Sequence, residues 1–193
     1  MAKLTDFMVS RVRSKLIKIF LSDPQEMFYV RQLTRLADEE INAVRRELAR
    51  MQEHGLVKPE NRGNRLYYFF KPSYPFYPQL LALVAKSTGL GLSLYKNRQR
   101  LGKVKFIMLS GRFVRGLPPL KDQVDLLVIG QIILPQLAIL VRNYEAKSKK
   151  EVNYTVMTED ELSYRKARRD PFILTILSGS RLMVIGDEEE LVS

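Results

Sequence analysis

Residues 41–70 read INAVRRELARMQEHGLVKPENRGNRLYYFF. In the first half of this stretch, four apolar residues recur at the spacing of one face of an α-helix: Ile41, Val44, Leu48 and Met51. Gly55 ends the pattern, because Gly is the usual residue just beyond a helix C-terminus. Two β-prone runs follow, at residues 56–60 and 66–70, and they flank a Gly- and Asn-containing turn. The stretch predicts a helix followed by a β-hairpin.

The residues that precede this stretch predict two more helices. Apolar residues recur at helical spacing at Val12, Leu16, Ile19 and Phe20, and Asp23-Pro24 ends that helix. The next expected features are a β-prone run at residues 28–30, one or two helical turns at residues 32–37 with Leu33 and Leu36 inward, and a helix cap at Asp38. The order helix, strand, helix, turn, helix, hairpin is that of a winged helix-turn-helix, which we assign to residues 1–73.

The rest of the chain predicts a linker helix region at residues 74–100 and a small mixed α/β sheet domain at residues 101–193. In the linker region a helix from about Gln79 to Lys86 is expected to break at Gly89-Leu90-Gly91. Expected strands of the sheet domain are residues 104–109, 124–129, 152–157 and 181–185, and expected helices are residues 134–147, 158–169 and 172–177. Thr158 with Glu161 forms a capping-box pattern. The predicted fold class is α+β.

Composition limits the possible functions. The 193 residues carry 32 Lys+Arg against 21 Asp+Glu, a net charge of +11, with no Cys and one His. These counts exclude a disulfide framework and a thiol nucleophile, and they disfavour a His-rich metal site or a Ser-His-Asp triad. No apolar run approaches the length of a membrane span, so we expect a soluble cytoplasmic protein with no membrane partner. The excess positive charge lies in residues 1–150, whereas residues 151–193 are net acidic. This distribution suggests a polyanionic partner such as nucleic acid; the alternatives are attraction between parts of the chain or between subunits, and ordinary surface charge.

The predicted DNA contacts come from three places. On the outer face of the helix at residues 41–53 they are Asn42, Arg45, Arg46 and Arg50; on the preceding helix Arg31, Gln32 and Arg35; at the hairpin tip Arg62, Asn64 and Arg65. Arg can bond guanine bidentately and Asn can do so for adenine, while the other positions suit phosphate contacts and the minor groove. The alternative is a solvated helix face, which Glu39, Glu40 and Glu53 support because they would repel DNA.

The second half of the chain resembles a minimal nucleotidyltransferase domain of the DNA polymerase β type. The resemblance rests on LSGRFVRG at residues 109–116 and DQVDLLVIG at residues 122–130, and it extends to about residue 190. In that family two carboxylates on one strand face hold the divalent metals that activate the attacking oxygen. Here the corresponding positions are Gln123 and Asp125, and Asp122 is expected to face the other way. Arg112 stands where the family has Ser, and no third carboxylate occurs in residues 152–157.

These departures imply a catalytically inactive, degenerate domain with no metal and no cofactor, since neutral Gln is a poor Mg²⁺ ligand. We favour dimerisation as the role of such a domain. The alternative is sensing of a nucleotide or other anionic effector in a remnant nucleotide pocket of Gly111, Arg112, Arg115, Gln123 and Asp125, with Lys121 as a further cation. The predicted function is sequence-specific binding of double-stranded DNA by a homodimeric transcriptional regulator. Alternatives are an active nucleotidyltransferase that modifies RNA or protein, of toxin–antitoxin type, and an RNA-binding or toxin–antitoxin interaction module.

Overall fold

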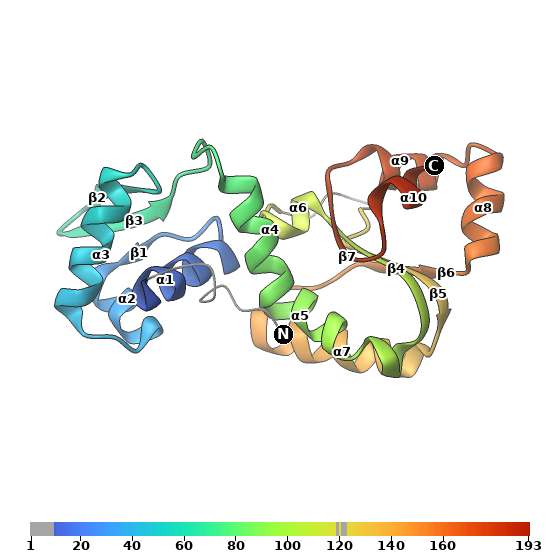
Figure 1. Cartoon of the computed structure of the whole chain (residues 1–193), viewed down its shortest axis with the longest axis horizontal. Coiled ribbons are helices and arrows are strands. Elements are labelled where there is room, and N and C mark those ends of the chain that lie inside the picture. Colours follow the sequence, from blue (N-terminus) through green and yellow to red (C-terminus); the bar gives the residue numbers. More distant parts are fainter. Residues whose placement is uncertain (1–9, 119, 121–122) are drawn as a thin grey trace. The chain divides into compact units, whose positions relative to one another are not determined.

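The computed structural model describes residues 10–118, 120 and 123–193, and the chain forms two compact units, residues 1–88 and 89–193 (Figure 1). The fold is mixed α+β, with 54% helix, 22% strand and two small sheets, which confirms the predicted class at that level. The boundary between the units falls between two helices, within the stretch 74–100. Across the described residues, no helix is both long and apolar enough to traverse a bilayer.

The first unit combines four helices and a three-stranded antiparallel sheet among its described residues. Its elements are α1 (Arg11–Ser22), β1 (Phe28–Tyr29), α2 (Val30–Ala37), α3 (Ile41–Glu53), β2 (Val57–Arg62), β3 (Arg65–Phe70) and α4 (Tyr77–Ser87). The sheet order is β1-β3-β2, and the hairpin closes with Arg62 opposite Arg65. The predicted order of elements from the first helix to the hairpin is therefore present.

Local sequence signals set the ends of these elements. The Ser10 hydroxyl caps α1 by accepting the Arg13 N–H at 3.2 Å, and α1 stops at Asp23. Gly55 follows α3 with φ of +74°, and Gly63 takes φ of +56° in the hairpin turn, a region that favours glycine. Helices and sheet share a core of buried side chains: Leu16, Phe20, Leu33, Val44, Leu48, Met51 and Phe70.

Three details of the first unit differ from the prediction. Asp38 does not cap α3: it ends α2 in the left-handed region (φ 49°), and the Glu40 side chain caps α3 instead. Leu36 is 53% exposed rather than inward, because α2 is short and buries Leu33 and Ala37. Val30 belongs to α2 rather than to the short strand before it.

The second unit is built around a four-stranded sheet with order β6-β5-β4-β7. Its elements are α5 (Gly89–Lys96), the 3₁₀ helix η2 (Arg98–Leu101), β4 (Gly102–Ser110), α6 (Gly111–Val114), β5 (Leu126–Ile132), α7 (Leu134–Ser148), β6 (Tyr154–Met157), α8 (Glu159–Ala167), α9 (Pro171–Ser178), β7 (Arg181–Ile185) and α10 (Glu188–Val192). β5 pairs with β6 in parallel, and β4 pairs antiparallel with β5 and β7.

Helices cover both faces of this sheet, with α5 and α7 on one side and α8 to α10 on the other (Figure 1). The core on the side of α8 to α10 contains Phe106, Met108, Leu127, Ile129, Met157, Leu162, Ile173, Met183 and Leu191. The intervening strand residues Ile107 and Val128 are also fully buried, so both faces of β4 and β5 are covered. This explains why both strands are continuous apolar runs rather than alternating ones.

The expected helix break is present, since α4 ends at Ser87 and Gly89 takes φ of +51°, but residues 89–96 then form a further helix, α5, which was not predicted. The second unit corrects two predicted strand boundaries. The strand expected at 124–129 begins at Leu126, so Gln123 and Asp125 precede it. The strand expected at 152–157 begins at Tyr154. The Thr158 cap is confirmed, since its hydroxyl accepts the Glu161 N–H at 3.1 Å.

Candidate nucleic-acid interface

A groove of about 570 Å³ lies in the first unit where α2, α3 and the hairpin turn meet. It is lined by Tyr29, Val30, Arg31, Arg35, Arg45, Asn64, Arg65 and Leu66. Five of the ten predicted DNA contacts therefore line one cavity, although they come from three elements far apart in the sequence. The other three lining residues, Tyr29, Val30 and Leu66, were not predicted, and no sequence signal marks them.

The groove is strongly cationic and its cations are available. None of the guanidinium groups of Arg31, Arg35, Arg45 and Arg65 lies within ion-pair distance of a described carboxylate, and of the four only Arg45 is close enough to Glu40 to lower its pKa. The guanidinium carbon of Arg65 lies 5.0 Å from the centroid of the Tyr29 ring, which itself packs edge-on against Tyr67. A cation held over an aromatic face is partly oriented before any ligand arrives. The site can therefore hold anionic groups against a partly apolar wall.

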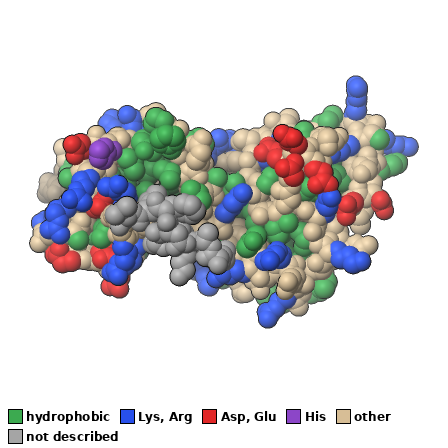
Figure 2. Space-filling model, viewed as in Figure 1, with side chains coloured by type: hydrophobic (Ala, Val, Ile, Leu, Met, Phe, Trp, Pro, Cys, Tyr) green, Lys and Arg blue, Asp and Glu red, His purple; other side chains and the backbone are tan. Residues whose placement is uncertain are grey.

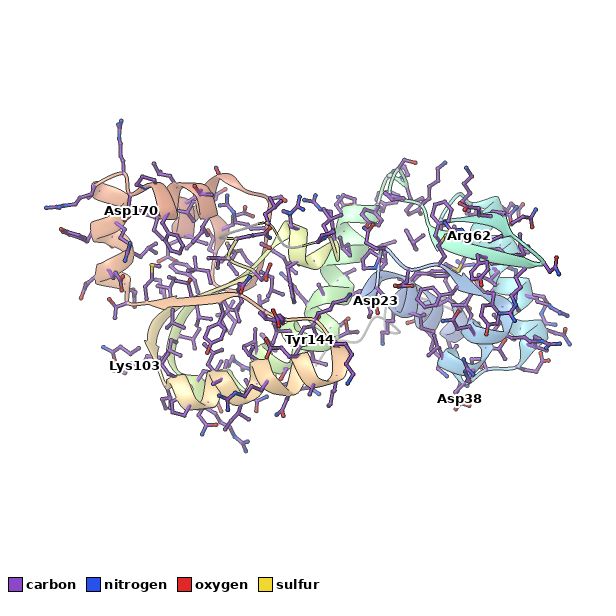
Figure 3. The ribbon with its side chains drawn as sticks, turned by 180° about the vertical axis from the view of Figure 1, so that it is seen from behind. Asp23, Asp38, Arg62, Lys103, Tyr144 and Asp170 are labelled. Atoms are coloured by element: carbon purple, nitrogen blue, oxygen red, sulfur yellow. The ribbon has the colours of Figure 1, made fainter. Side chains whose placement is uncertain are left out.

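The other predicted contacts lie outside this groove. Asn42 and Arg46 are exposed on the outer face of α3, as predicted. Arg50 is exposed too, but its Nη1 lies 3.9 Å from the carboxylate of Glu47. Gln32 is half-buried on α2. At the hairpin (Figure 3), Arg62 pairs with Glu60 at 2.8 Å, so part of its charge is compensated within the hairpin.

The acidic residues near α3 are largely engaged by the protein itself. Glu39 pairs with Lys15 at 2.7 Å and with Arg11 at 2.8 Å, and the Lys15 hydrogen bond is the main cause of its lowered pKa. The Glu40 carboxylate accepts the Asn42 N–H at 2.8 Å and also the Ala43 N–H, and these bonds lower its pKa. Of the three acids expected to repel DNA, only Glu53 lacks such a partner among the described residues.

Glu47 is a buried carboxylate that links α3 to the start of α1. Its oxygens accept the Ser10 hydroxyl at 2.9 Å and the Arg13 Nε–H. The residue lies on the inward face of α3 beside Val44 and Leu48. An acidic residue at such a position in the helical pattern was the sequence signal that could have predicted a buried carboxylate. A buried charge is retained only when it is paired and hydrogen-bonded, as it is here. The contact fixes α3 against α1.

In the second unit, Gln123 and Asp125 contact each other, although both precede β5 and do not share a face of that strand as predicted. The Gln123 Nε2 donates to the Ser110 hydroxyl at 3.1 Å and to the Asp125 Oδ1 at 3.3 Å. The other Asp125 oxygen accepts the Asn153 N–H at 3.1 Å. Asp125 is buried, and burial raises its pKa, which the Asn153 bond partly offsets. Both carboxylate oxygens are thus bonded to groups of the chain.

The remaining residues of the predicted pocket bond elsewhere. Arg112 Nη2 donates to the Pro118 carbonyl at 2.9 Å, and Arg115 Nη2 donates to the Ser180 hydroxyl at 3.0 Å. Gly111 is needed because a Cβ there would lie 2.1 Å from the Ser180 hydroxyl oxygen. Ser110, Asn153 and Ser180 were not predicted as members of this cluster. Lys121 and Asp122 lie outside the described residues.

The described residues contain no group of three or more His, Cys, Asp or Glu side chains that could hold a metal ion. The Ser110, Gln123 and Asp125 cluster offers one carboxylate, one amide and one hydroxyl, a weak donor set for a divalent cation. Compared with known proteins, this chain matches no family model, no curated protein and no solved structure.

Proposed function

We propose that this protein is a sequence-specific, double-stranded-DNA-binding transcriptional regulator whose first unit acts as a winged helix-turn-helix. The observation that carries this proposal is the arginine-lined groove between α2, α3 and the hairpin turn. Four guanidinium groups without carboxylate partners among the described residues concentrate positive charge at the place where a recognition helix and a wing would meet DNA. A DNA partner also favours a cytoplasmic protein.

In this proposal the groove and the helix face have different tasks. Arg35, Arg45 and Arg65 bind phosphates and so fix the position of the protein on the duplex. Asn42 and Arg46, exposed on the outer face of α3, enter the major groove and read base edges, Arg46 through two N–H donors and Asn42 through its amide donor and acceptor. The buried contact of Glu47 with α1 keeps α3 in a fixed orientation while it does so.

For the second unit we propose a degenerate nucleotidyltransferase-like domain without catalytic activity, used for dimerisation or effector sensing. The support is the hydrogen-bonded pair of Gln123 and Asp125, in which an amide stands where the family places a metal-binding carboxylate. A homodimer would present two recognition helices to two half-sites, and linked binding events raise the affinity of both.

The first test removes the groove cations from the full chain. The variant Arg35→Gln, Arg45→Gln, Arg65→Gln is compared with the control Lys58→Gln, Lys71→Gln, Lys86→Gln, which removes the same charge from exposed positions of the same unit. The magnitude of the slope of log K against log salt is about 0.9 per phosphate contact. We therefore expect the groove variant to reduce this slope by about 2 to 3 and the control to reduce it much less. Equal slopes for the two variants, or no duplex binding by the wild type, would refute the proposal.

The second test concerns Arg46, the central exposed arginine of α3. If its side chain reads a base, Arg46→Ala weakens binding to a specific duplex by about 1–3 kcal/mol and leaves binding to random duplex nearly unchanged. Equal loss on both duplexes would reassign Arg46 to phosphate contact. No loss on either would reject α3 as the recognition helix.

A further inference from the structure

The second unit begins with a long stretch free of acidic residues. Residues 87–121 contain no Asp or Glu and eight basic residues. Four of these are exposed and close together in the chain around η2: Lys96, Arg98, Arg100 and Lys103. We call these four residues the η2 basic surface. Figure 2 shows Lys and Arg side chains over the part of the unit that contains α5 and α7, and Figure 3 shows Lys103 extending away from the sheet.

The backbone that carries these cations is firmly held. Leu101 is fully buried, and its carbonyl accepts the Ile133 N–H at 2.8 Å. The Asn97 carbonyl accepts the N–H groups of Arg100 at 2.8 Å and of Leu101 at 3.2 Å. Gly102 passes so close to β5 that a Cβ would lie 2.3 Å from the Gln131 carbonyl oxygen. The surface is therefore a fixed turn rather than a loose run of charge.

The four cations have no acidic partner among the described residues, whereas other cations of this unit do. Lys105 pairs with Glu190, and Arg165 pairs with Glu161 and Asp170. The elements packed against η2 are α5, β4 and α7. The first two contain no acid, and the single acid of α7, Glu145, lies near its far end and accepts the Val152 N–H at 2.9 Å.

Arg98 is also oriented in advance. Its guanidinium carbon lies 4.6 Å from the centroid of the Tyr95 ring, and its Nη1 donates to the Tyr95 carbonyl at 3.0 Å. These contacts leave its remaining N–H groups for a ligand. Four like charges held together without a counter-charge repel one another, and a polyanion relieves that repulsion when it binds.

We propose that the η2 basic surface binds the phosphodiester backbone of duplex DNA, so that the second unit adds its own sequence-independent contacts to those of the first. The inference rests on the proposed function for the identity of the polyanion. Because the backbone around η2 is held by the fold and Arg98 is oriented by Tyr95, little backbone freedom is lost when this surface meets phosphates. No base reading is involved, so the surface contributes equally on every sequence.

The test uses the full chain and a 30-base-pair duplex of random sequence. The variant Lys96→Gln, Arg100→Gln, Lys103→Gln leaves Arg98 and its contacts with Tyr95 in place. The control removes three exposed charges elsewhere in the unit: Lys147→Gln, Lys149→Gln, Arg169→Gln. We expect the η2 variant to lower the slope of log K against log salt by about 2 to 3, at 0.9 per phosphate contact, and the control to lower it by less than one.

The outcomes separate this inference from the proposed function. Suppose that the groove variant of the first unit binds as the wild type does while the η2 variant shows a reduced dependence of log K on log salt. The inference then stands and the proposed role of the groove is wrong. If only the groove variant loses its slope, the inference is overturned. The inference is also overturned if the η2 variant binds duplex DNA as the wild type does but no longer self-associates, which would assign the surface to the acidic α10 of a second copy. It is likewise overturned if the η2 variant keeps duplex binding but no longer binds anionic vesicles. Absence of duplex binding by the wild type overturns both.

Discussion

Glu47 offers the sharpest test of how the first unit holds α3. Among the described residues of that unit it is the only buried carboxylate, and it bonds the Ser10 hydroxyl and the Arg13 Nε–H from the start of α1. Glu47→Ala removes both bonds at once. We expect the variant to be less stable and to bind duplex DNA more weakly, because α3 is then free to shift against α1.

The size of the effect follows from the contacts. A hydrogen bond to a charged group contributes about 1.5–3 kcal/mol. The Arg13 side chain is 34% exposed, so its freed guanidinium regains water and the lower end of that range applies. The Arg50 contact at 3.9 Å is solvent-exposed on the arginine side and adds little. Two bonds of about 1.5 kcal/mol each give about 3 kcal/mol, and at about 4–8 °C per kcal/mol for a unit of this size the melting temperature falls by roughly 12–24 °C.

The assay is urea unfolding of the full chain, with hydrogen exchange of the α3 amides to report on the first unit separately. A double-mutant cycle with Arg13→Ala isolates the pair, and we expect a coupling energy of about 1–2 kcal/mol. Lys58→Ala, an exposed residue of β2 without an ion pair among the described residues, serves as the control. A coupling energy below about 0.5 kcal/mol, together with unchanged exchange in α3, would refute the reasoning.

Three further predictions concern the second unit. Burial raises the pKa of Asp125 above its ordinary value, so the protonated form stabilises the fold and this stability is lost as the pH rises through the raised pKa. In urea titrations Asp125→Asn should therefore gain stability relative to the wild type as the pH rises from about 4, and a pH-independent difference would contradict this. Gly111→Ala places a methyl group 2.1 Å from the Ser180 hydroxyl oxygen and should cost about 1–3 kcal/mol by thermal unfolding, so unchanged melting would show that the approach is not tight. The purified protein should transfer no nucleotide from labelled nucleoside triphosphates with Mg²⁺. Labelling of RNA or protein by the wild type that is absent with Asp125→Asn would show that the second unit is catalytically active.

Much of the fold could be predicted because local signals decide it. Asp23-Pro24 ends α1, Gly55 ends α3, and Gly63 allows the tight turn of the hairpin. Thr158 caps α8 with its hydroxyl, as the spacing to Glu161 predicted. In each case the deciding interaction lies within a few residues of the signal, so no knowledge of tertiary contacts is needed.

The errors arise where tertiary contacts override local preference. The helix breaks before Gly89 as predicted, but α5 over residues 89–96 was missed, because burial of Leu90 and Leu94 outweighs the low helix propensity of its glycines. Asp38 is a good N-cap type, but it takes the left-handed conformation that ends α2 and leaves the capping to Glu40. Local composition could not show which of the three consecutive acids at residues 38–40 would cap α3.

The candidate site was predictable in its charges but not in its shape. The exposed arginines of α2, α3 and the hairpin follow from helical periodicity and from the turn sequence. Their convergence with Tyr29 and Leu66 in one groove depends on how the hairpin packs beside α2, which is a long-range contact. The hydrogen bonds of Ser110 to Gln123, and of Asn153 to Asp125, likewise join residues that are distant in sequence.

The central claim is that this chain recognises a specific duplex sequence. The most direct measurement is selection of binding sites from a pool of random duplexes, followed by equilibrium binding of the selected and unselected duplexes at one physiological salt concentration. We expect an enriched sequence that binds the wild type at least about 10³-fold more tightly than random duplex does. An unenriched pool, or equal affinity for selected and random duplexes, would contradict it.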